Sequence, residues 1–258
     1  MIPSLISRRD ALAALASTAV LPLTSGCRSE RAVIAPAATI EADARALLDE
    51  LAENLLRLLP ESATSLGIDT GARAPLRAQL TDRSASGQQR IASQLESDLE
   101  RAHAVDTSGL SHGTRTSVEV VRSAYATALE GFALPYGDVA VGGWRNTPYV
   151  VIQNVGAYLD VPRFLDSDHR IENAVDAEAY LARLQSCGKA LDGELGRMRA
   201  ARATGLVPPA FLIDKALAQM GLSAQNAREG GTIVDSIARR SKNIPGNWAQ
   251  RARTIVSQ

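Results

Sequence analysis

Apolar residues recur at three- and four-residue steps along most of the chain, and this spacing predicts a mainly α-helical fold. The first long pattern covers residues 39–59, with Thr39 as its N-cap and Pro60 as its end. Two further helices are expected at residues 84–105 and 111–130, because each range carries an apolar stripe against a polar back.

The helix at 111–130 is expected to start with Ser111 as its N-cap. We expect it to lie deep in the core, because Val120 and other apolar residues widen its buried face on a second side. Residues 60–82 contain glycines and prolines at irregular positions, so this range is predicted to be a connecting segment.

The second half of the chain carries further helical patterns. In order, they are a helical turn at 161–168, a helix capped by Asp176 and closed by Gly205, a short helix from 208 to 220 that Gly221 stops, a piece after Gly230–Gly231 ending near Lys242, and a helix opening at Trp248. The clearest stripe belongs to the second of these and contains Tyr180, Leu184, Cys187, Leu191, Leu195 and Met198. Because Cys187 lies on this apolar stripe, we predict that it is a small buried thiol rather than a reactive one.

Between residues 136 and 158 the helical spacing stops. These 23 residues contain three of the five tyrosines, one of the two tryptophans and four glycines. β-Formers alternate here with turn formers, so one short β-hairpin or an irregular segment is expected at about 136–154.

The same segment is rich in amide, guanidinium and aromatic groups, which together are typical of a ligand-binding wall. An alternative is that these groups pack one helical layer onto another. The candidate residues for a substrate cleft are Trp144, Arg145, Asn146, Tyr149, Gln153 and Asn154.

The first 26 residues are typical of an export signal. Arg8 and Arg9 resemble a twin-arginine signal, and the apolar run at 11–23 is about 13 residues long, short of the roughly 20 that cross a bilayer. Cys27 ends a segment that resembles a lipoprotein box, and residues 27–38 have the composition of a tether. We therefore expect an exported, periplasmic protein that is lipid-anchored through Cys27; simple cleavage near 35–38 is the alternative.

Charge and histidine spacing exclude several function classes. The 28 basic and 28 acidic residues cancel, so no net field favours nucleic acid, and two cysteines make no disulfide framework. His103, His112 and His169 lack the spacing of a metal site and are expected to face solvent. No catalytic residue, metal ligand or cofactor is assigned to this chain.

Several segments resemble, in order, the N-terminal half of a bacterial family of secreted and lipid-anchored proteins, domain of unknown function 885. They are P-E-S-A-T-S-L-G-I at 60–68, L-T-D-R-S at 80–84, P-Y-V-V-I-Q-N-V-G-A-Y at 148–158, D-A-E-A-Y-L-A-R-L at 176–184 and G-L-V-P-P-A-F at 205–211.

The resemblance implies the helical N-terminal part of a zincin-like hydrolase of the gluzincin type. Complete members look like zinc-dependent peptidases whose metal motif lies in the second half, so zinc is expected in the full-length family and not in this chain. Residues 39–258 would then be a domain truncated at its C-terminus.

The resulting prediction is a non-catalytic N-terminal portion of an exported, peptidase-like hydrolase that contributes one wall of the substrate cleft. Its partners would be the missing C-terminal half and a peptide substrate, with membrane contact only through the signal or lipid anchor. One alternative is a free-standing helical periplasmic lipoprotein that binds a peptide or partner protein. Another is a remnant without a stable fold.

Overall fold

The computed structural model describes residues 36–142, 146–229 and 231–257, and residues 37–258 form one structural unit. The export signal at 1–26 with Arg8 and Arg9, the lipidation site Cys27, and the cleft candidates Trp144 and Arg145 lie outside the described residues. Within the described residues, no helix combines the length and the apolar character that a bilayer crossing requires.

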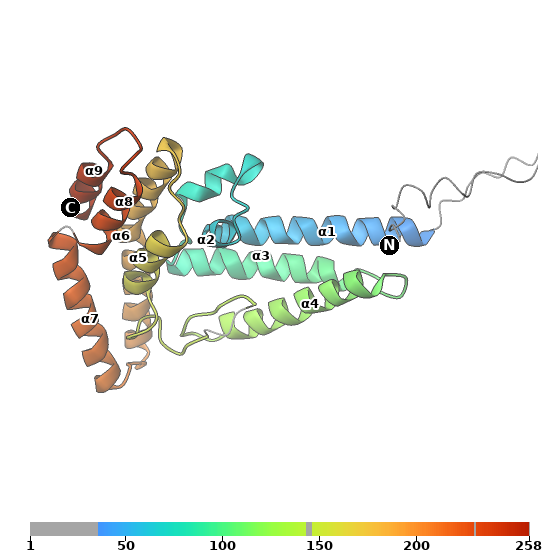
Figure 1. Ribbon diagram of the computed structural model, residues 1–258. Coiled ribbons are helices and arrows are strands. Elements are labelled where there is room, and N and C mark those ends of the chain that lie inside the picture. The colour runs from blue at the N-terminus through green and yellow to red at the C-terminus, as the bar shows by residue number, and fades with distance from the viewer. Residues whose placement is uncertain (1–35, 143–145, 230, 258) are drawn as a thin grey trace, which may run out of the picture. The chain divides into compact units, whose positions relative to one another are not determined.

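The expectation of a mainly α fold is confirmed (Figure 1). The helices are α1 (Pro36–Leu58), α2 (Pro60–Ser65), the 3-10 helix η2 (Gly71–Ala78), α3 (Ala85–His103), α4 (His112–Phe132), α5 (Ala157–Ser167), α6 (Ala174–Ala203), α7 (Ala210–Arg228), α8 (Thr232–Arg240) and α9 (Trp248–Val256).

Two of the expected helix starts are confirmed by their hydrogen bonds. The hydroxyl of Ser84 accepts from the Gly87 N–H, and that of Ser111 accepts from the Thr114 N–H. The prediction for Asp176 is wrong, since the N-cap of α6 is Asn173, whose Oδ1 accepts from the Asp176 N–H. Asp176 lies in the first turn with its carboxylate buried.

Other boundaries differ from the sequence expectation. The helix α1 begins at Pro36, so Thr39 is inside it, and the segment at 60–82 contains α2 and η2. Pro60 ends α1 but also occupies the first turn of α2. N–H groups in the first turn have no acceptor within the helix, so the missing N–H of proline costs no hydrogen bond there. Gly221 does not stop α7, because one glycine costs a helix only about 1 kcal/mol.

The principal core lies where α5, α6, α8 and α9 meet. Its fully buried side chains include Leu165, Tyr180 and Ile237, with Trp248 at its edge. A second cluster joins α3 and α4 through Ile91, Leu95, Tyr125 and Ala128. Val120 is 59% exposed, so the expectation that it widens the buried face of α4 is wrong, whereas Ala128 on the same helix is buried.

The segment between α4 and α5 is irregular, with two isolated antiparallel bridges among its described residues, Asp138–Thr147 and Ile152–Val155. Gly137 permits the first bridge. Its φ is +91°, and a Cβ there would lie 2.5 Å from the carbonyl oxygen of Thr147. Of the two sequence expectations for this segment, the irregular one fits the described residues, whereas the hairpin is reduced to single bridges.

His169, expected to face solvent, is completely buried. Its Nδ1 lies 2.9 Å from Nη1 of Arg183, and its Nε2 lies 2.9 Å from the carbonyl oxygen of Asp176. A guanidinium only donates, so Nδ1 accepts and Nε2 carries the hydrogen. Burial lowers the pKa of His169 to about 4, and the imidazole is neutral in the folded protein at neutral pH.

This histidine predicts acid sensitivity. The unfolded chain binds a proton at His169 near pH 6.5 and the folded chain only near pH 4, so stability is full above pH 6.5 and falls as the pH drops through this window. At about 1.4 kcal/mol per pH unit, the loss is about 3 kcal/mol. Urea unfolding at stepped pH would measure it, and the variant His169→Gln should lack this slope. Equal slopes in both proteins would contradict the prediction.

Candidate functional site

A polar cavity of about 690 Å³ opens beside the segment between α4 and α5. Its walls come from parts of the chain that are distant in sequence: α2, the loop before α3, residues 138–141, α5 and α6. The charged side chains in its wall include Glu61, Arg83, Asp138, Asp160 and Glu194. We call it the polar cavity.

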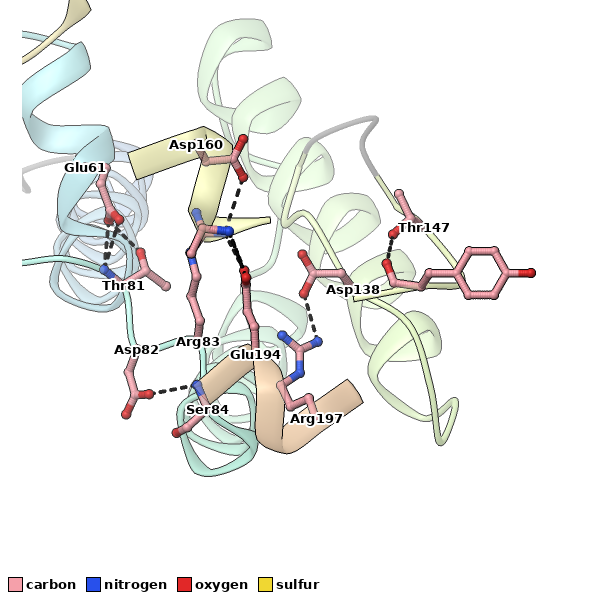
Figure 2. A network of polar contacts seen from close by, with 12 residues as sticks. Glu61, Thr81, Asp82, Arg83, Ser84, Asp138, Thr147, Asp160, Glu194 and Arg197 are labelled. Atoms are coloured by element: carbon pink, nitrogen blue, oxygen red, sulfur yellow. Dashed lines mark hydrogen bonds and ion pairs between the residues drawn. The ribbon is translucent and has the colours of Figure 1, made fainter. Parts of the chain in front are cut away.

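Arg83 and Glu194 form the central pair of the polar cavity. Figure 2 shows the guanidinium of Arg83 between two carboxylates, with Nη1 2.8 Å from Oε1 of Glu194 and 3.3 Å from Oδ2 of Asp160. The carboxylate of Glu194 also accepts from the Ala157 N–H at 2.8 and 3.0 Å, at the start of α5. Glu194 therefore fixes a loop arginine and a helix N-terminus at the same point.

Burial raises the pKa of Glu194, against the lowering effects of Arg83 and of the Ala157 N–H. The side chain is 4% exposed, so a charge here depends on those partners for its stabilisation. Both carboxylate oxygens are already engaged. This arrangement suits a positioning role better than proton transfer to a ligand.

Two further charged side chains, Arg197 and Glu61, hold the walls of the polar cavity. Nη2 of Arg197 on α6 donates to Oδ1 of Asp138 at 2.8 Å and to the Gly137 carbonyl at 2.7 Å. Glu61 on α2 accepts from the backbone N–H of Thr81 at 3.0 Å and from its hydroxyl at 2.6 Å (Figure 2). The irregular segment and the loop before α3 are thus anchored to helices by charged hydrogen bonds.

Gly193 makes the approach of α6 to Arg83 possible. A Cβ at this position would lie 2.7 Å from the Ser84 backbone nitrogen and 2.9 Å from the Arg83 carbonyl carbon. Any side chain would push the loop away from the helix and separate Arg83 from Glu194.

We expect Gly193→Ala to lower the free energy of unfolding by about 2 kcal/mol through this overlap. Gly188→Ala and Gly196→Ala are matched controls on the same helix, because nothing lies within 4 Å of the added Cβ. Each should raise stability by up to about 1 kcal/mol. Urea unfolding followed by circular dichroism measures all three, and a Gly193→Ala protein as stable as the parent would refute the overlap.

A second cavity lies beside residues 149–152, between the C-terminal part of α6 and α7. It has a volume of about 330 Å³, and most of its lining side chains are apolar. We call it the apolar cavity. The irregular segment therefore borders two cavities of opposite character.

The predicted cleft residues are dispersed along this segment. Tyr149 lines the apolar cavity, whereas Asn146 and Asn154 are exposed. The Asn146 Oδ1 accepts from the Ala140 N–H at 2.7 Å, and the Oε1 of Gln153 is buried without a hydrogen-bond partner among the described residues. The charged residues of the polar cavity were not singled out from the sequence.

The described residues do not fit a zinc site. Among them, no three His, Cys, Asp or Glu side chains gather in a way that would hold a metal ion. His103 and His112 are exposed. Cys187 packs beside the principal core, and burial raises the pKa of its thiol to about 11.

Residues 60–258 match the sequence model of the family described as "Bacterial protein of unknown function (DUF885)". The chain belongs to this family. The resemblance inferred from short segments is confirmed at that level, and the polar cavity is built almost entirely from residues inside the DUF885 match.

Among solved structures, the fold is similar to the crystal structure of the "putative lipoprotein" from Colwellia psychrerythraea, with a TM-score of 0.69 and 17% identity. The match covers 85% of this DUF885 chain and 38% of the Colwellia chain, so this protein spans well under half the length of that relative. No curated protein matches the sequence.

Proposed function

We propose that residues 39–258 form the non-catalytic N-terminal portion of an exported, zinc-dependent peptidase-like hydrolase and supply one wall of its substrate cleft. The polar cavity carries this proposal. It brings α2, α3, α5, α6 and the irregular segment to one hollow large enough for a small ligand.

The chemistry of the polar cavity suits substrate positioning. Its carboxylates at Glu61, Asp138 and Asp160 would attract an ammonium or accept from peptide N–H groups, and Arg83 would donate to a carbonyl. The pairs with Arg197 and Thr81 keep these groups in place. A peptide is the substrate class with which these donors and acceptors are compatible.

The zinc ion implied by the family resemblance would be held by a second portion. Exposed apolar side chains offer a surface for it: Leu191 on α6 is 40% exposed, and Phe211 and Leu222 on α7 are 60% and 62% exposed. The Colwellia chain, with more than half its length outside the match, is long enough to supply such a portion.

We also propose export to the periplasm with a lipid anchor at Cys27. The arginine pair, the short apolar run and the cysteine support it. The structural relative's name as a lipoprotein agrees with this assignment.

A family member that contains both portions tests the proposal. Replacing its counterpart of Asp138 by asparagine should lower kcat/KM for peptide hydrolysis at least about tenfold, because the carboxylate charge is removed from the cavity wall and the hydrogen bond from Arg197 is weakened, while zinc content stays the same. The counterpart of exposed Asp192 is the matched Asp→Asn control. Unchanged turnover, or no peptide hydrolysis by the parent enzyme, would contradict the proposal.

A free-standing helical lipoprotein that binds a peptide or partner protein is the second candidate. The apolar cavity beside Tyr149 and the exposed Phe211 and Leu222 favour it. A purified protein that is monomeric and melts cooperatively would favour this candidate, because a half-domain without its covering portion should associate or melt without cooperativity.

A further inference from the structure

The apolar cavity has the composition of a small-molecule site. Its walls include Val151, Leu195, Ala216 and Met220, and its volume of about 330 Å³ is at the lower end of the range for ligand pockets. Two lining residues are charged, and both are arginines on α6.

Arg199 and Arg202 are three residues apart on α6, so they lie on the same side of the helix. Both are exposed, and neither side chain forms an ion pair or hydrogen bond with any residue that the structure describes. The other two arginines of α6 differ. Arg183 donates to four acceptors and Arg197 pairs with Asp138.

We propose that the apolar cavity binds a free medium-chain carboxylic acid, with the acyl chain inside and the carboxylate at Arg199 and Arg202. Apolar walls favour the chain, since each buried methylene contributes about 0.8 kcal/mol. The two guanidiniums provide planar donors for the carboxylate.

The lining favours an acyl chain over a peptide. A buried peptide brings N–H groups that need acceptors, and an unpaired one is costly. The side chains in the wall are apolar apart from Tyr149 and the two arginines, whose charged groups only donate. An acyl chain has no polar group along its length and leaves nothing unpaired. This site is separate from the polar cavity and does not depend on the proposed peptidase function.

The methionines allow a direct test. The sequence has three, and two of them, Met198 and Met220, line the apolar cavity. In NMR spectra of protein labelled with [methyl-¹³C]methionine, decanoate below its micellar concentration should shift both signals in a saturable way. The shared shift would place the ligand between α6 and α7.

The charge contribution is isolated with the double variant Arg199→Gln/Arg202→Gln and with 1-decanol, which lacks the carboxylate. The double variant should bind decanoate about tenfold more weakly and 1-decanol with unchanged affinity. Arg253→Gln, at an exposed arginine on α9, is the matched control and should bind decanoate like the parent protein.

The cavity itself is tested with Ala216→Leu, which fills space at a residue 7% exposed. This variant should weaken both ligands several-fold while circular dichroism shows the parental helix content. If it does not fold, the surface arginine variants still decide the question. Absence of saturable shifts at Met198 and Met220 would overturn the proposal, as would equal decanoate affinity in the parent and the double variant.

Discussion

Replacing Arg183 by methionine is expected to lower the free energy of unfolding by about 5 kcal/mol. The side chain is completely buried, and its guanidinium donates to the carbonyl oxygens of Gln79 and Leu76 at 2.8 and 3.0 Å. It also donates to the Thr64 hydroxyl and to His169 Nδ1. Methionine keeps much of the volume but removes the donor from four acceptors, three of which (the Thr64 hydroxyl, His169 Nδ1 and the Leu76 carbonyl) lie in buried contacts. Each buried group left unpaired costs about 1–3 kcal/mol.

Urea unfolding at pH 7 measures this loss. Arg199→Met is the matched control, because the same substitution at an exposed position of α6 should change stability by no more than about 0.5 kcal/mol. A loss below about 1 kcal/mol in Arg183→Met would show that water or rearrangement satisfies the acceptors. That result would refute the importance of the Arg183 hydrogen bonds for the fold.

The contacts of Arg183 explain what holds α2 and η2, the two short helices that the sequence pattern did not predict. The Leu76 carbonyl belongs to η2 and the Gln79 carbonyl to the residue after it, while Thr64 belongs to α2. Arg77 of η2 adds two ion pairs to these contacts, one with Asp69 at 2.9 Å and one with Asp176 of α6. These elements contribute Ala63 and Leu76 to a small apolar cluster, and they are also held by polar contacts to residues about 100 positions away. Hydrophobic periodicity could not predict such distant contacts.

The sequence predicted the longer helices because their stripes and serine caps are local features. Ser84 and Ser111 bond to N–H groups three residues away, a distance that a sequence pattern encodes. The N-cap of α6 was misplaced because Asp176 and Asn173 are both good capping residues. The contacts of Asp176 with Arg77 and the Glu172 N–H engage its carboxylate elsewhere.

The position of the candidate site was partly predictable, whereas its chemistry was not. Glycines and aromatic residues at 136–158 correctly indicated where the helices stop, and this segment borders both cavities. Arg83 and Glu194 are 111 residues apart and become neighbours only through tertiary packing at Gly193. His169 was misjudged for the same reason, since its polar sequence neighbours gave no indication of burial against Arg183.

Replacing Glu194 by leucine is expected to lower the free energy of unfolding by about 4 kcal/mol, because a buried charge pair loses one member. The Ala157 N–H would lose both of its carboxylate contacts, and Arg83 would retain only the longer contact with Asp160 among those that hold it in the cavity. Thermal or urea unfolding measures the change. Glu178→Leu, on the same helix with an exposed ion pair to Arg251, is the matched control and should lose no more than about 1 kcal/mol.

A double-mutant cycle separates the ion pair from the cap. Arg83→Met alone leaves Glu194 buried with its raised pKa and only the Ala157 N–H as a close partner, so we expect a loss of about 3 kcal/mol. The double variant should be more stable than the sum of the single losses predicts, by about 2–3 kcal/mol, because neither charge is then left without its partner. Strict additivity would mean that Glu194 acts on Ala157 and the start of α5 alone. In that case the contact of Glu194 with the Ala157 N–H would determine the shape of the polar cavity. The guanidinium of Arg83 would then be available to bind a ligand carboxylate or carbonyl.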